Sequence, residues 1–397
     1  MVDREQPEDA RRGPQRPATP WRAAWVAVLV ASFATDAFAA TDATKRKANR
    51  PTAKATAKKT PVVQPVKTPA PDYAKRADVI DFVDALVASE RFDREALLQM
   101  FGDARYSATA ARLMMPSPSP STGVRRDWTA YRARFVEPVR LAAGFRFWDD
   151  NAALLARAER EFGVPAEIIV GILGVETVYG RNTGSFRVLD ALTTLAFDYP
   201  DKQRDRSAFF REQLTDVLRM TRDGTADLAT LRGSYAGAIG MPQFMPGSIR
   251  SYAIDYDGDG RVDLVDSVTD VVGSVANFLV QHGWVRDRPT HLPLTGSAGI
   301  DAAQLARIDA MVEAGSVPTL AYVDLVAAGL STSAPVVEPL ALIDLPSGID
   351  RAGRPLVSYL AGTQNFHVIT RYNRSYFYAF SVIELGATIR ALRDARQ

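Results

Sequence analysis

The sequence contains no cysteine and only three histidines in 397 residues. Without cysteine, the chain can form no disulfide, thiolate metal site, cysteine nucleophile or lipid-modified cysteine. The histidines His282, His291 and His367 lie far apart, which argues against a multi-histidine metal site or an HExxH metalloprotease. A GxSxG motif is also absent, so a serine hydrolase of that type is disfavoured.

The chain also lacks a strong net charge, which is only +2. The basic excess is confined to residues 40–71, which carry +7, so residues 72–397 carry about −5. A nucleic-acid-binding domain would place its basic excess on the folded body, so we predict no nucleic-acid partner. The composition, 47% hydrophobic and 24% charged, is that of a globular protein, and the length predicts two or three domains.

The apolar run at residues 23–33 is too short to span a bilayer, which needs about 20 residues. Arg22 precedes this run, and Ala37-Phe38-Ala39 follows it as a small-x-small cleavage site. These features predict a secretory signal peptide over residues 1–39 and a periplasmic protein. An uncleaved anchor and a buried helix are the alternatives.

Residues 40–75 are rich in Ala, Thr, Lys and Pro and contain almost no large apolar side chains. Such a segment cannot bury enough surface to fold, so a flexible basic linker is predicted. Two roles stay open for it: loose attraction to anionic envelope polymers, or a spacer without a binding role.

The folded body has mainly helical patterns. Apolar residues recur at spacings of three and four from Val79, and Asp93 is a plausible N-cap of the next helix. A single amphipathic helix is predicted over 145–162, ending at Gly163, and a last helix from Ser375. A turn-rich stretch at about 290–365 predicts strands, with apolar residues that include Val317, Leu320, Tyr322, Val323, Val336, Val337, Leu340 and Leu342.

This order of elements predicts an α+β fold, mainly α. Beyond the signal peptide and linker, the expected regions are an N-terminal helical region at 76–160, a catalytic core at 161–290, a small β-containing module at 291–365 and a C-terminal aromatic segment and helix at 366–397.

One carboxylate stands out in the helix predicted after Pro165. Glu176 shares a helix face with Ile169, Ile172 and Leu173, and the helix is apolar almost all round. Desolvation raises the pKa of a carboxyl group in such a wall and suits it to general acid catalysis. The alternative is an ordinary carboxylate at a frayed helix end.

Two further segments suit an uncharged polyhydroxylated ligand. Residues 234–248 alternate small residues with Ser234 and Gln243, which offer a hydroxyl and an amide. Residues 371–380 hold Tyr372 and Tyr378 beside Asn373, and tyrosine rings stack on sugars. A glycine-rich turn and an aromatic core plug are the structural alternatives.

The chain resembles the membrane-bound lytic murein transglycosylase B family over about four-fifths of its length. Five strings in order carry the resemblance: EFGVPAEIIVGILGVETVYGRNTG, RVLDALTTLAFDYP, SYAGAIGMPQFMPGS, DYDGDGRVDL and NFHVITRYNRSYFYAF. The resemblance implies a lysozyme-like core, cleavage of the β-1,4 bond between N-acetylmuramic acid and N-acetylglucosamine without water, and a 1,6-anhydromuramoyl product.

In this family one glutamate acts first as acid and then as base, and Glu176 occupies its place. The resemblance assigns sugar contacts to Ser234, Gln243, Tyr372, Asn373, Tyr378 and Arg206, although extra residues at 201–205 precede the arginine. It implies glycan strands as the partner, with other cell-wall enzymes as further candidates, a monomer, and no cofactor for the chemistry.

The number of carboxylates agrees with this chemistry. Ordinary glycosidases use two carboxyl groups, and the nearest downstream acid, Asp190, is better read as a helix cap or packed polar group. Two rival hypotheses stay open: a glycoside hydrolase that uses water, and a peptidoglycan-binding protein without turnover.

Residues 255–266 match the spacing of an EF-hand calcium loop, although Asp stands at its last position instead of Glu. The loop is therefore either a structural calcium site or an ion-free turn. The predicted ligands are Asp255, Asp257, Asp259, Arg261 through its carbonyl, Asp263 and Asp266.

Overall fold

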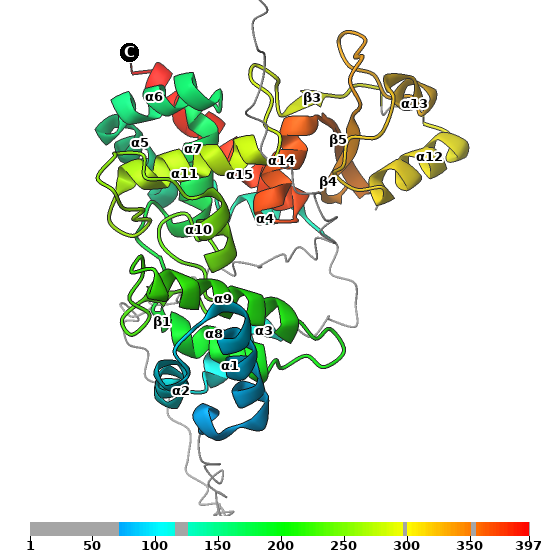
Figure 1. The fold of residues 1–397 in the computed structure, drawn as a ribbon. Coiled ribbons are helices and arrows are strands. Elements are labelled where there is room, and N and C mark those ends of the chain that lie inside the picture. Colours follow the sequence, from blue (N-terminus) through cyan, green and yellow to red (C-terminus); the bar gives the residue numbers. More distant parts are fainter. Residues whose placement is uncertain (1–70, 116–125, 297–299, 351–354, 397) are drawn as a thin grey trace, which may run out of the picture.

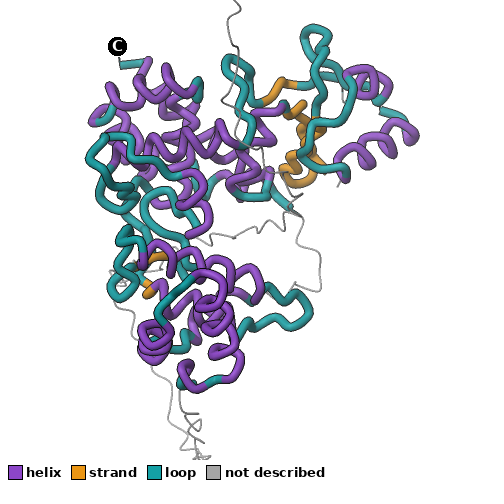
Figure 2. Tube along the Cα trace, viewed as in Figure 1, coloured by secondary structure: helices purple, strands orange, loops and turns teal. Residues whose placement is uncertain are grey.

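The computed structural model describes residues 71–115, 126–296, 300–350 and 355–396. The predicted signal peptide and nearly all of the predicted linker lie outside these residues. Within the described ranges, no helix is both long enough and apolar enough to cross a membrane. Helices dominate the chain, and the strands gather in two small sheets (Figure 2).

The lower part of the molecule in Figure 1 is a helical lobe built from two separate stretches of the chain. Asp93 caps its second helix by accepting a hydrogen bond from the amide of Ala96, as predicted. Phe82, Phe101 and Phe197 join the stretches through edge-to-face ring contacts. The elements are η1 (Tyr73–Lys75), α1 (Ala77–Glu90), α2 (Arg94–Asp103), α3 (Ala108–Met114), β1 (Phe186–Arg187), α8 (Val188–Phe197), α9 (Ser207–Arg222) and β2 (Arg232–Gly233).

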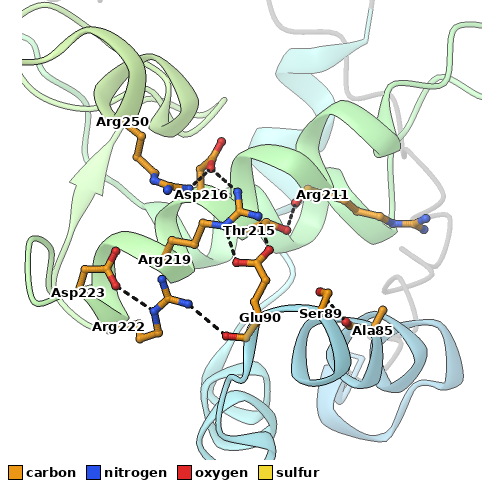
Figure 3. A network of polar contacts seen from close by, with 10 residues as sticks. All are labelled: Ala85, Ser89, Glu90, Arg211, Thr215, Asp216, Arg219, Arg222, Asp223 and Arg250. Carbon is orange, nitrogen blue, oxygen red and sulfur yellow. Dashed lines mark hydrogen bonds and ion pairs between the residues drawn. The ribbon is translucent and has the colours of Figure 1, made fainter. Parts of the chain in front are cut away.

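An ionic network holds this lobe together and reaches beyond it (Figure 3). Arg219 of α9 pairs with Glu90 at the end of α1 and with Asp216 at 2.8 Å. Asp216 also accepts a hydrogen bond at 2.7 Å from Arg250, which lies on α10 of the upper part. The network therefore joins the N-terminal helices to both halves of the body.

The upper part is a second helical layer (Figure 1). Its centre is α7, which packs closely against α15 because Gly171 and Gly386 leave room for the facing backbone. The last helix begins where it was predicted, and Ser375 caps it by accepting a hydrogen bond from the amide of Tyr378. The elements are α4 (Trp128–Arg132), α5 (Pro138–Asp150), α6 (Ala152–Phe162), α7 (Ala166–Thr177), α10 (Pro246–Tyr252), α11 (Val268–Gln281), α14 (Gln364–Tyr372) and α15 (Tyr376–Asp394).

The single helix predicted over 145–162 is wrong, because the chain forms two helices that meet at Asn151. The side-chain amide of Asn151 donates to the carbonyl of Phe147 at 2.8 Å. An asparagine that bonds the backbone in this way competes with the helical ladder. The second of the two helices does end at Gly163, which adopts the left-handed conformation.

A small α/β module lies at one side of the upper part (Figure 1). Its antiparallel sheet has the order β3-β5-β4. Two helices cover it around a separate core that includes Ile308, Leu325 and Leu340. The elements are β3 (His291–Pro293), α12 (Ala302–Glu313), α13 (Tyr322–Ala327), β4 (Ala341–Ile349) and β5 (Pro355–Gly362).

The strand character predicted at Tyr322 and Val323 is wrong, since both residues lie in α13. Only Leu325 of this short helix is fully buried, while Val323 is 68% exposed. β-Branched and aromatic residues favour strands only as a weak prior, and packing of one helix face on the sheet overrides it here.

Candidate active site

Glu176 is the next-to-last residue of α7 and is only 7% exposed. The apolar residues before it on α7 are buried, so its carboxyl group lies in apolar surroundings, as predicted. Burial raises the pKa of Glu176 to about 7, and a hydrogen bond from Tyr378 opposes this rise. The carboxyl group is therefore mostly protonated at pH values below about 7.

Tyr378 reaches Glu176 from the first turn of α15. Its hydroxyl donates to Oε1 of Glu176 at 2.6 Å, across 202 positions in the sequence. Ser375 fixes this turn because its Oγ accepts a hydrogen bond from the amide of Tyr378 at 3.2 Å. The close approach of α7 and α15 thus creates the contact.

Tyr372 ends α14 and lies parallel to Tyr378, with ring centroids 6.4 Å apart. Burial raises the pKa of both hydroxyls well above the ordinary value, and the charge of Glu176 adds to the rise. The Tyr372 hydroxyl donates to the carbonyl of Pro242 at 2.5 Å. Asn373 follows directly at the end of α14 and is half-buried.

The loop at 234–248 contacts the same place through its backbone. The carbonyl of Met241 accepts a hydrogen bond from the Thr177 hydroxyl at 2.8 Å, one residue after Glu176. Together with the bond from Tyr372 to Pro242, this contact fixes the loop beside Glu176. The structure therefore brings the three segments selected from the sequence to one place.

The side chains of Ser234 and Gln243 form hydrogen bonds with backbone groups of this loop, and Gln243 also with the carbonyl of Thr183. Oγ of Ser234 accepts hydrogen bonds from the amides of Ala236 and Ala238, so it closes a tight turn. Nε2 of Gln243 donates to the carbonyls of Thr183 and Gly240 at 3.0 and 2.9 Å. Both side chains are only partly buried, so they shape the loop and still reach its surface.

Arg206 lies in the lower lobe, at the start of α9. Its guanidinium group lies over the rings of Phe209 and Phe210. Burial lowers the pKa of Arg206, and the positive charge of Arg374, which follows Asn373, adds to this effect. Arg206 thus lies within electrostatic range of the segment that carries the tyrosines.

The sequence analysis missed Tyr131 as a site residue. Tyr131 lies on α4 and packs against Phe377, with ring centroids 5.3 Å apart. Burial raises its pKa, and the charge of Glu176 contributes a smaller part of the rise. No local pattern marks this residue, because its electrostatic interaction with Glu176 depends on how α4 packs against α15.

No second carboxylate in the described part of the chain contributes to the pKa of Glu176. Asp190 lies instead in the first turn of α8, where it accepts a hydrogen bond from the amide of Arg105 at 2.9 Å. This agrees with its interpretation as a packed polar group. The site therefore has one protonatable carboxyl group among tyrosines, which suits a single residue that gives and then takes a proton.

The acidic loop at 255–266 is separate from this site. Oxygens of Asp255, Asp257 and Asp259 lie within 4.8 Å of one another. Asp263 and Asp266 are outside this group, because the Asp263 carboxylate accepts hydrogen bonds from the amides of Val265 and Asp266. Three of the six predicted ligands thus converge through their carboxylates.

Asp270, which is fully buried at the start of α11, organises the loop. Its carboxylate accepts hydrogen bonds from the amides of Tyr256 and Asp263 at 2.7 and 2.8 Å. The three converging carboxylates carry several negative charges in a small volume, which suits a hard divalent cation with oxygen ligands.

A mainly helical fold with one buried, protonatable carboxyl group beside stacked tyrosines is the arrangement of a lysozyme-like enzyme that cleaves glycosidic bonds. The comparisons with known proteins narrow this class. A family model described as "Transglycosylase SLT domain" matches residues 74–387.

Relatives of known structure and activity agree. The chain is 36% identical over 332 residues to membrane-bound lytic murein transglycosylase B of Escherichia coli (strain K12), covering 81% of this chain and 85% of that protein. The catenated lytic transglycosylase SltB1 from Pseudomonas aeruginosa is 39% identical with a TM-score of 0.70, over 81% of this chain and 100% of that one. The Escherichia coli lytic transglycosylase Slt35 in complex with calcium is 36% identical with a TM-score of 0.69, over 81% and 95%.

The chain therefore belongs to the transglycosylase SLT domain family. It is a lytic murein transglycosylase that acts on peptidoglycan. The family resemblance seen in the sequence and the lysozyme-like, mainly α fold are both confirmed.

Proposed function

We propose that Glu176 performs both proton transfers in a non-hydrolytic cleavage of the β-1,4 bond between N-acetylmuramic acid and N-acetylglucosamine. The observation that carries the proposal is the buried Glu176 carboxyl group, which accepts a hydrogen bond from Tyr378 at 2.6 Å. Its pKa, raised by burial to about 7, keeps a proton available for the leaving group near neutral pH.

In the first step the Glu176 proton passes to the glycosidic oxygen, and the bond from that oxygen to the anomeric carbon breaks. In the second step the C6 hydroxyl of the muramoyl residue attacks the anomeric carbon and gives its proton to Glu176. The product carries a 1,6-anhydromuramoyl end, and Glu176 returns to its acid form. Neither step consumes water.

The sugar-contacting residues in this proposal are those selected from the sequence: Ser234, Gln243, Tyr372, Asn373, Tyr378 and Arg206. The tyrosine hydroxyls stay protonated because their pKa values are raised, chiefly by burial. Each gives its single proton to Glu176 or to the Pro242 carbonyl, so toward a sugar hydroxyl its oxygen is a neutral acceptor. Their role is to hold the muramoyl ring so that its C6 hydroxyl faces the anomeric carbon.

Mass spectrometry of products from purified sacculi tests the reaction. We expect anhydromuropeptides whose ends resist borohydride reduction. Reducible ends would instead indicate a glycoside hydrolase that uses water, and binding without product would indicate a peptidoglycan-binding protein. A muramidase that uses water is the matched control for the reduction step.

A structural cation in the 255–266 loop is part of the proposal. Support comes from the three converging carboxylates and from the calcium complex of the relative Slt35. The cation would be held by Asp255, Asp257, Asp259 and the Arg261 carbonyl, with Asp263 and Asp266 as outer ligands. It would neutralise the carboxylates and stabilise the fold, and the chemistry at Glu176 needs no cofactor.

We propose export to the periplasm, directed by residues 1–39, followed by action as a monomer on glycan strands, alone or beside other cell-wall enzymes. The small-x-small site after the apolar run supports export. Mass determination of the amino terminus of protein recovered from a periplasmic extract tests it. A mature chain that starts at residue 40 is expected, and an uncleaved chain in the membrane fraction would contradict the proposal.

A further inference from the structure

The chain leaves α7 through an unusual turn directly after Glu176. Val178, Tyr179 and Gly180 all have positive φ, at 52°, 58° and 83°. A β-branched residue rarely adopts this left-handed conformation, so the turn is strained and must be held by its surroundings. Such strain next to a reacting group suggests that the position of that group is being enforced.

Arg140 of α5 forms strong hydrogen bonds near this turn, one of them to the last turn of α7. Its Nε donates to the carbonyl of Gly174 at 2.8 Å, and its Nη1 donates to the carbonyl of Arg134 at 2.7 Å. Arg140 is only 6% exposed, and the Glu137 carboxylate lies 3.7 Å from its Nη1. A buried guanidinium group therefore bonds carbonyls at the end of α7 and in the segment after α4.

The two carbonyls lie close in sequence to Glu176 and to Tyr131. Gly174 lies two residues before Glu176, and Arg134 lies three residues after Tyr131. The ring of Tyr179 stacks on Phe147, also on α5, with centroids 5.1 Å apart. The α5 helix thus fixes the strained turn from one side.

We propose that Arg140 is a positioning residue, which holds the end of α7 and the segment after α4 in the register that aims Glu176 at the bond to be cleaved. The inference rests on the proposed role of Glu176. A planar guanidinium group can bond two carbonyls in fixed directions, whereas a lysine ammonium group has no such fork. Charge alone therefore does not replace it.

The test compares Arg140→Lys with Arg132→Lys. Arg132 lies on the preceding helix, α4, and pairs with Glu384 on the surface of α15 at 2.8 Å, so it is the matched control. We expect Arg140→Lys to bind sacculi as the parent does. Its rate of anhydromuropeptide release per folded molecule should fall by up to about tenfold. Arg132→Lys should keep the parental rate.

The pH profile separates positioning from stability. A loosened α7 end lets water reach Glu176, which lowers its pKa, so the pH at which activity falls on the alkaline side should decrease in Arg140→Lys. An unchanged rate per folded molecule and an unchanged profile would overturn the proposal. Failure of the parent to release anhydromuropeptides would count against the proposed function and not against Arg140.

Arg140→Gln provides a second variant, because a neutral amide costs less to bury without its full set of partners. It should show the same loss of rate and the same direction of pH shift. If both variants fail to fold while Arg132→Lys folds, Arg140 serves stability alone and the positioning role is wrong.

Discussion

Glu176 and the aspartates of the 255–266 loop carry the same functional group in opposite surroundings. Glu176 is buried and accepts a hydrogen bond from one tyrosine, and burial raises its pKa to about 7. Asp257 and Asp259 are exposed, and their carboxylates accept hydrogen bonds from within the loop and from Ser267. Isolation in an apolar wall suits a carboxyl group to the proposed role of acid, whereas crowding at an exposed loop suits carboxylates to the proposed cation site.

Replacement of the buried carboxyl group tests the first half of this comparison and should have the largest effect. Glu176→Gln keeps the shape but cannot transfer a proton, so anhydromuropeptide release should fall by about 10²- to 10⁴-fold while sacculi are still bound. Initial rates on purified sacculi measure the loss. Near-normal release would remove Glu176 from the chemistry.

The same variant should gain stability at high pH. The folded-state pKa of Glu176 is raised by burial, so the proton it holds favours folding below its ordinary pKa of 4.5, and this contribution is lost as the pH rises through about 7. The free energy of unfolding of Glu176→Gln should therefore exceed that of the parent by on the order of 3 kcal/mol at pH 8. The two values should match near pH 4.5.

Urea unfolding at both pH values measures this difference. An equal difference at both pH values would mean that ionisation of Glu176 carries no cost in the folded protein.

Removal of the crowded charges tests the other half of the comparison. A cation that binds only the folded protein stabilises it, by about 2.7 kcal/mol when the cation concentration is 100 times the dissociation constant. The melting temperature rises accordingly. Chelator should lower the melting temperature of the parent by several degrees, and the Asp257→Asn, Asp259→Asn double variant should lose this response. Glu176→Gln should keep it. Identical melting with and without chelator in the parent would make the loop a plain turn.

The smallest effect is expected when Tyr378, the hydrogen-bond partner of Glu176, is replaced. Burial raises the pKa of Glu176, and the Tyr378 hydrogen bond partly opposes it, so Tyr378→Phe should raise that pKa further. The alkaline limb of the pH–rate profile should move to higher pH, opposite to the shift expected for Arg140→Lys. The rate should fall severalfold because the grip on the sugar weakens.

Phe377 provides the matched structural control for Tyr378. It packs between Trp128 and Tyr131 in the core, so Phe377→Ala should cost about 3–5 kcal/mol of stability. Tyr378→Phe should melt within a few degrees of the parent. Tyr378 is only 2% exposed, so a large melting loss in Tyr378→Phe with a normal rate would mean that this residue serves packing and not the reaction.

Features that depend on local spacing were predictable from the sequence. The apolar face around Glu176, the cap at Asp93, the helix end at Gly163 and the start of the last helix at Ser375 follow from periodicity and backbone chemistry within a few residues. The break at Asn151 and the helix at Tyr322–Ala327 were missed, because each depends on a side-chain bond or a packing face that competes with local propensity.

The sequence by itself determined which carboxyl group lies on an apolar helix face and which aspartates share a loop, because a helical apolar face and a fixed residue spacing are local properties. Only the tertiary structure decided what surrounds them. Tyr378 meets Glu176 across 202 positions because Gly171 and Gly386 let α7 and α15 pack closely. The same packing explains why Tyr131 and Arg140 carry no signal in the sequence: their partners are backbone and side chains of other helices, which no spacing along the chain specifies.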